Sequence, residues 1–112
     1  MLYQRKFKIQ YAQVFEITCL TMRTITIKFK ETQKKEVILG VGFFDGSFDI
    51  YNLVIGDKSV ILKKITSFGP PKEKEAVTNL VFSKKNIYAS RLHSVTLYKE
   101  ALEAVFNIIV EN

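Results

Sequence analysis

The sequence alternates apolar and polar residues along several short runs, and this period of two restricts the fold more than any other feature. Ile25, Ile27 and Phe29 alternate with threonines and lysines, and residues 6–11 repeat the pattern. Successive side chains of a β-strand point to opposite faces, so each run predicts a strand with one buried face. We therefore predict an all-β fold of antiparallel strands.

A turn signal separates two of these runs. Asp45 and Gly46 lie between residues 37–43 and residues 48–54, both rich in β-forming side chains. Asp-Gly between such runs is a strong hairpin signal, because glycine adopts positive φ without steric cost. A further turn leads into residues 60–66, so three consecutive antiparallel strands are expected. Substitution of Asp45 or Gly46 is expected to damage folding more than binding.

The second half of the chain continues the meander after a long loop. Two prolines and a charged stretch occupy residues 69–75, where no sheet hydrogen bonding is expected. Beyond the loop, residues 76–82, 87–89 and 95–98 read as short strands. The segment after the loop is too short to fold alone, so residues 1–112 are expected to be a single domain or part of one.

An internal repeat links the two halves. Three pairs of segments match: residues 17–20 with 77–80, residues 38–40 with 87–89, and residues 47–52 with 94–99. Self-similarity of this kind is typical of repeated structural units. Each unit reads as successive antiparallel strands, the third of which ends in a tyrosine, followed by an outer strand.

With these residues the chain resembles WD40-like β-propeller repeats. Asp45-Gly46 stands where that family has its Asp-Gly turn, Tyr51-Asn52 where it has Trp-Asp, and residues 76–83 look like an innermost blade strand. The resemblance implies about two degenerate blades, which form part of a propeller or complete one.

The two units cover approximately residues 14–68 and 76–111. The sequence departs from the family pattern by having no tryptophan, no Gly-His pair ahead of either unit, and Leu92-His93 in place of the second Asp-Gly. Propellers close with about 4–8 blades, so two blades would leave sheet edges open to a partner or to self-association.

A second architecture fits the same runs. Seven strands followed by a helix resemble a pleckstrin-homology-like barrel with a C-terminal helix. Leu102, Val105, Phe106 and Ile109 have the spacing of one helix face. Residues 105–110, however, include β-branched side chains, and the repeat favours a closing strand there.

The chain is basic, with 17 Lys and Arg against 11 Asp and Glu. Such a balance favours phosphate-bearing partners, or it serves to solubilise exposed strands. The alternative function is therefore a polyanion-binding module that contacts phosphoinositide or an RNA backbone. Its candidate residues are Arg23, Lys28, Lys30, Lys34 and Lys35.

Catalytic chemistry is not indicated. His93 is the single histidine and Cys19 the single cysteine, so neither a multi-histidine nor a cysteine-rich metal site is available. We expect His93 to be a polar loop residue and Cys19 a buried inert thiol. The chain is therefore predicted to be non-enzymatic, without a metal or other cofactor.

The favoured function is a protein–protein interaction or scaffold module within a larger complex. The N-terminus has no secretory signal pattern and no run is long enough to cross a bilayer, so an intracellular location, cytoplasmic or nuclear, is expected. Aromatic residues beside the turns are the candidate partner contacts. They are Phe43, Phe44, Phe48, Tyr88 and Tyr98.

Overall fold

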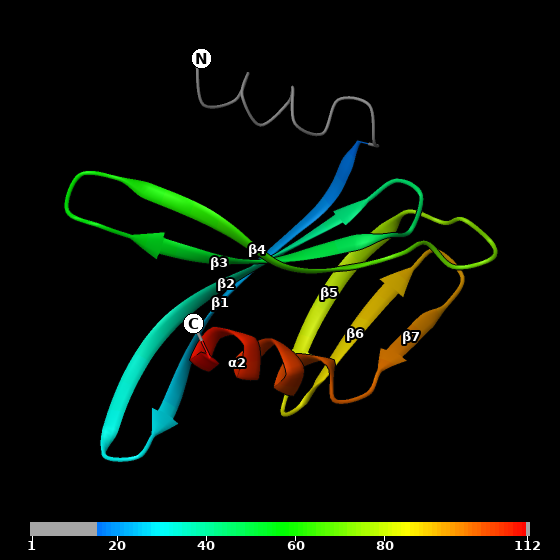
Figure 1. Cartoon of the computed structure of the whole chain (residues 1–112). Helices are drawn as coiled ribbons and strands as arrows, with labels where there is room; N and C mark the ends of the chain where they lie inside the picture. Colours follow the sequence, from blue (N-terminus) through cyan, green and yellow to red (C-terminus); the bar gives the residue numbers. More distant parts are fainter. Residues whose placement is uncertain (1–15, 112) are drawn as a thin grey trace.

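The computed structural model describes residues 16–111, which form two antiparallel sheets and a C-terminal helix (Figure 1). The elements are β1 (Ile17–Phe29), β2 (Thr32–Phe43), β3 (Phe48–Ile55), β4 (Val60–Phe68), β5 (Val77–Ser83), β6 (Asn86–Arg91), β7 (Val95–Tyr98) and α2 (Ala101–Glu111). The predominantly β, antiparallel fold predicted from the alternation is confirmed. The strand expected over residues 6–11 lies outside the described residues.

Both sheets are meanders in which each strand pairs with its neighbour in sequence. The first sheet has the order β1-β2-β3-β4 and the second the order β5-β6-β7. The hairpin predicted at Asp45-Gly46 joins β2 to β3: Gly46 has a φ of 95°, and Asp45 Oδ1 accepts a hydrogen bond from the Ser47 backbone N–H at 2.9 Å. The turn prediction is confirmed, and the positive φ explains why glycine is needed.

The main core lies between the two sheets and the helix. Ile38, Phe48 and Ile50 of the first sheet pack with Leu80 and other residues of the second sheet and with apolar residues of α2. Two glycines of β2 let the sheets approach closely, because a Cβ at Gly40 would lie 2.8 Å from Leu80 Cδ1 and one at Gly42 would lie 2.7 Å from Val77 Cβ. The Gly40-x-Gly42 spacing therefore serves packing between the sheets.

The first strands of the two sheets, β1 and β5, lie side by side. Their contact is partly polar. Thr18 Oγ1 donates a hydrogen bond to the Val77 carbonyl at 2.7 Å, and the Arg23 guanidinium donates to the Phe82 carbonyl. Side chains of β1 thereby satisfy carbonyls at both ends of β5.

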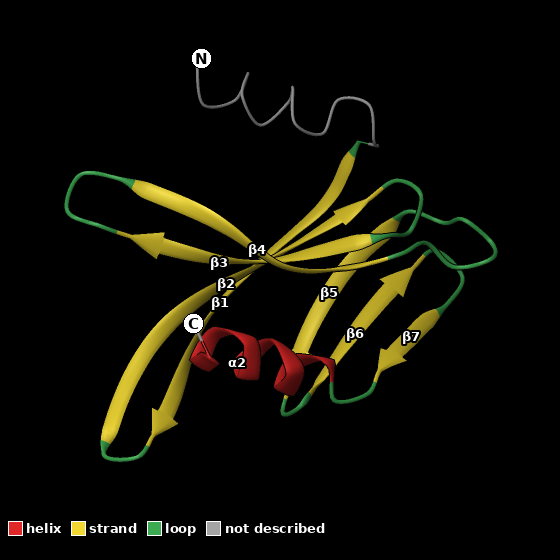
Figure 2. Ribbon diagram, in the orientation of Figure 1, coloured by secondary structure: helices red, strands yellow, loops and turns green. Residues whose placement is uncertain are grey.

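The last segment is the helix α2, which corrects the expectation of a closing strand (Figure 2). Leu102 and Val105 on its apolar face are buried in the main core. The Leu102 and Glu103 backbone N–H groups donate to the Lys85 carbonyl at 3.0 and 3.2 Å. The helix prevails over β propensity because the helical spacing of its apolar residues buries one face and because the β5–β6 turn, through the Lys85 carbonyl, satisfies two of its first amides.

Seven strands followed by a helix is the element order of the barrel alternative. The described strands, however, form two separate sheets with no closed barrel, which corrects that part of the alternative. The propeller interpretation stays a prediction.

The sheet registers test the internal repeat directly. Ile17 pairs with Phe43 as Val77 pairs with Arg91, and both pairs precede an irregularity in the ladder. Leu20 pairs with Val41, and Leu80 pairs with Ala89. Ala89 therefore corresponds to Val41 in the structure, whereas the sequence alignment had matched it with Gly40. The turn after β6 is one residue shorter than the turn after β2, since Arg91 N bonds Ser94 O whereas Phe43 N bonds Ser47 O.

Candidate functional site

The five aromatic residues predicted to contact a partner occupy three different environments. Phe43 and Phe48 are buried in the core, which corrects their assignment as partner contacts. Tyr98 is half-buried and packs edge-on against Phe48, with ring centroids 5.0 Å apart. Phe44, in the β2–β3 turn, and Tyr88, at the centre of β6, remain on the surface.

Tyr88 belongs to a continuous apolar patch on the second sheet. Val81 pairs with Tyr88 and Tyr88 pairs with Leu97, so these three side chains form a row across all three strands. Val95 lies on the same side of β7 as Leu97. We call Val81, Tyr88, Val95 and Leu97 the outer face, because the opposite side of this sheet holds Leu80, Ile87 and Ala89 of the core.

The outer face is exposed although it is apolar. Val81, Val95 and Leu97 are 42%, 67% and 49% exposed, and Tyr88 is half-buried. A solvated face of an antiparallel sheet is normally polar. In addition, no described strand pairs with the outer edge of β7, whereas β4 occupies the corresponding place beyond β3. Both the face and the edge are therefore available to a further β-structure.

The predicted polyanion contacts differ in their surroundings. The Arg23 guanidinium is engaged with the Phe82 carbonyl, and Lys28 and Lys30 are exposed near the β1–β2 turn. Lys34 and Lys35 instead reach a groove of about 410 Å³ between the diverging β1–β2 and β3–β4 hairpins. Figure 1 shows the two hairpins spreading apart like a fork.

We call this hollow the fork groove. It is lined by Lys34, Lys35, Glu36 and Val37 of β2, Asn52, Leu53, Val54 and Ile55 of β3, Lys63 and Ile65 of β4, and Ile109 of α2. Sequence reasoning missed Lys63 and Ile109, because residues so far from Lys34 in the chain meet only through the register of β4 and the docking of α2. The Lys63-Lys64 pair was visible in the sequence but carried no indication of which residues it would join.

The electrostatics of the fork groove are unbalanced. Three lysines face one carboxylate, Glu36, which binds Lys34 Nζ at 3.1 Å and accepts a hydrogen bond from Asn52 Nδ2 at 3.2 Å. Within residues 16–111, no carboxylate pairs with Lys35 or Lys63. The groove thus combines an excess of positive charge with apolar walls.

The single cysteine and the single histidine each have a local partner. Cys19 is half-buried beside the main core, with its Sγ 3.8 Å from Thr21 Oγ1. His93 is exposed in the β6–β7 turn, where its Nδ1 lies 2.9 Å from Glu75 Oε2. In the described part of the chain, no three His, Cys, Asp or Glu side chains are grouped as metal ligands.

The His93–Glu75 contact supports a test of the loop that joins the two sheets. The His93 side chain and then its backbone N–H hydrogen-bond Glu75, and these bonds lower the pKa of that carboxyl below its ordinary value. Because the folded pKa is depressed, the contact stabilises the fold above the ordinary pKa of glutamate, and this contribution is lost as the pH falls through the folded value. We expect His93→Ala to raise the pKa of Glu75 part of the way back, measured by carbon-detected NMR titration. An unchanged Glu75 pKa would show that the imidazole does not hold the carboxylate.

None of the described helices is long and apolar enough to span a membrane. No protein-family model, curated protein or solved structure matches the chain.

Proposed function

We propose that the chain is a non-enzymatic protein-interaction module that docks a further β-sheet on its outer face. The observation that carries this proposal is the row of Val81, Tyr88 and Leu97 across a sheet face that no element of residues 16–111 covers. Removal of apolar surface from water contributes about 25 cal/mol per Å². A sheet packed on this row would therefore stabilise the resulting complex.

The packing between the two sheets supports a propeller-like role for the module. The first sheet covers the inner side of the second, and the adjacent strands β1 and β5 come first in their respective meanders. Successive blades of a propeller stack in this manner around their innermost strands. A third sheet would find on the outer face an apolar surface of the same kind as the one already covered.

The proposal predicts that the isolated chain associates with itself through the outer face. We expect concentration-dependent dimers or larger assemblies in size-exclusion chromatography with light scattering, because an apolar sheet face beside an open edge favours association. The double variant Val95→Lys, Leu97→Lys should shift the assembly to monomer, since two buried ammonium groups would be costly at the interface.

A matched control adds the same charge to another exposed strand. Leu20 and Met22 of β1 are 62% and 65% exposed, and the variant Leu20→Lys, Met22→Lys should leave the assembly unchanged. A wild-type chain that stays monomeric at high concentration, or a control that dissociates the assembly equally well, would contradict the proposal.

A further inference from the structure

The first sheet divides where the pairing between its two central strands ends. The β2–β3 ladder runs from Gly42↔Phe48 to Val37↔Leu53 and stops there. Beyond that point, β2 continues paired only with β1, and β3 continues paired only with β4. Residues 33–36 of β2 therefore have an edge with which no described strand pairs, and residues 34–36 of this edge line the groove.

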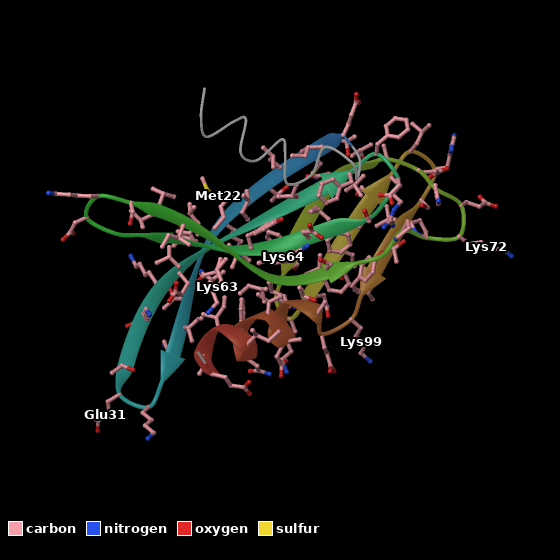
Figure 3. All side chains as sticks on the ribbon, turned by 45° about the horizontal axis from the view of Figure 1, so that its top comes forward. Met22, Glu31, Lys63, Lys64, Lys72 and Lys99 are labelled. Atoms are coloured by element: carbon pink, nitrogen blue, oxygen red, sulfur yellow. The ribbon has the colours of Figure 1, made fainter. Side chains whose placement is uncertain are left out.

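This open edge borders both charge and apolar surface. Lys35 and Lys63 have no carboxylate partner among residues 16–111. Val54 of β3, Ile65 of β4 and Ile109 of α2 supply apolar walls. Figure 3 shows Lys63 between the two hairpins and Glu31 at the far tip of one of them.

Three features of the fork groove select among possible occupants. An extended peptide can hydrogen-bond to an open strand edge, whereas a helix already satisfies its own backbone groups. A nucleic-acid strand would gain from aromatic stacking platforms or arginines, and neither residue type lines the groove. The lysines favour carboxylates, and the apolar walls favour aliphatic side chains between them.

From this combination we infer that the fork groove binds an extended partner segment in which acidic and aliphatic residues alternate. Lys35 and Lys63 lie on opposite faces of the sheet, because Lys63 stands in the same row as Ile38 and Asn52. The segment adds as a strand to the edge formed by residues 33–36 of β2, with its carboxylates on the face of Lys35. Its aliphatic side chains pack toward Val54 and Ile109. This binding site is separate from the outer face and does not depend on the function proposed for that face.

The test uses a fluorescently labelled peptide of typical strand length in which Glu and Asp alternate with Val and Ile. Binding is followed by fluorescence anisotropy to the variant Val95→Lys, Leu97→Lys, so that self-association through the outer face does not interfere. We expect saturable binding that weakens with salt, because surface charges are screened. A peptide with lysines in place of the acidic residues should not bind.

Charge reversal in the fork groove should then remove the binding. Adding Lys35→Glu and Lys63→Glu should weaken it at least about tenfold, since the charge pair with Lys35 becomes unfavourable and the groove changes from an excess of positive to an excess of negative charge. The matched control adds Lys72→Glu and Lys74→Glu in the loop before β5, far from the fork groove, where Figure 3 shows Lys72. This control should change the affinity less than about twofold, since long-range effects are screened by salt.

Hydrogen exchange locates the bound peptide. Backbone amides within residues 33–36 should become protected on binding, because some of them would enter a new ladder. Equal binding by the groove and loop charge variants, protection confined to β7, or equal binding of the lysine peptide would each overturn the inference. Groove-dependent binding of heparin with no binding of the acidic peptide would also overturn it and would assign the groove to polyanions.

Discussion

Gly42→Val is expected to destabilise the fold by about 3 kcal/mol, because overpacking a tight core typically costs 1–3 kcal/mol and valine adds three carbons. A Cβ at this position would lie 2.7 Å from both Cβ and Cγ1 of Val77 and 3.2 Å from the Cβ of Cys19. The Val77 Cβ is attached directly to the backbone of β5, so relief of that contact requires the two sheets to separate, whereas Cys19 is the partner of Gly42 in the neighbouring strand β1. The melting temperature should fall by more than about 10 °C, measured by circular dichroism.

Gly69, which has open space around it, serves as the control. A Cβ added at Gly69 would meet no atom within 4 Å, so Gly69→Val should change the stability by no more than about 0.5 kcal/mol. If Gly42→Val melted like the wild type, the close packing of β2 against β5 would be wrong. If both variants were equally destabilised, the loss would reflect glycine's backbone freedom and not the contact between the sheets.

Arg91→Met should have the second large effect. The Arg91 side chain is buried, with 5% of the residue exposed, and its guanidinium donates to the Gly46 carbonyl at 2.7 and 3.3 Å. It also donates to Thr96 Oγ1 and to the Tyr98 hydroxyl, each at 2.9 Å. These bonds tie the β2–β3 turn of the first sheet to β7 of the second.

Methionine fills a similar length but donates no hydrogen bond. The Gly46 carbonyl would lose two donors from one charged group, and hydrogen bonds of this kind contribute about 1.5–3 kcal/mol. We expect a loss of about 2–4 kcal/mol in urea unfolding, seen as a lower midpoint at unchanged slope. Arg91→Lys should not restore the stability, because a single ammonium cannot reproduce the planar fork of donors.

Arg23→Met is the comparison for that experiment. Arg23 also donates to a backbone carbonyl, that of Phe82, but it is exposed. Water can replace its hydrogen bond, so the loss should stay below about 1 kcal/mol. An Arg91→Met variant as stable as the wild type would mean that the cost of burying the guanidinium cancels its hydrogen bonds.

The alignment of the two units predicted two of the three strand equivalences correctly. The matches of β1 with β5 and of β3 with β7 agree with the observed pairings, since Ile17 and Val77 occupy equivalent places and Ser47 and Ser94 close equivalent turns. The match of β2 with β6 was wrong by one residue. A turn that is one residue shorter shifts one strand of a ladder and leaves the alternation of its side chains intact, so the sequence pattern contains no sign of the shift.

The candidate site was harder to anticipate than the strands. Tyr88 was expected on the surface and lies on the outer face, but Phe43 and Phe48 looked equally available and are buried. All three are aromatic residues in strands, and which face of a strand becomes covered depends on the partner sheet. Lys35 was anticipated as a basic contact, whereas its neighbour in the fork groove, Lys63, was not.

The sequence by itself determined what depends on neighbouring residues: the strands from their alternation, the hairpin from Asp45-Gly46, and two competing structures for the last segment. The tertiary structure decided what depends on distant residues. Burial of Leu102 and Val105 against both sheets selected the helix, and the end of the β2–β3 ladder opened the fork groove. The physical reason is that pairing and burial are gained only when segments far apart in the chain meet, and a local pattern leaves open which segments those are.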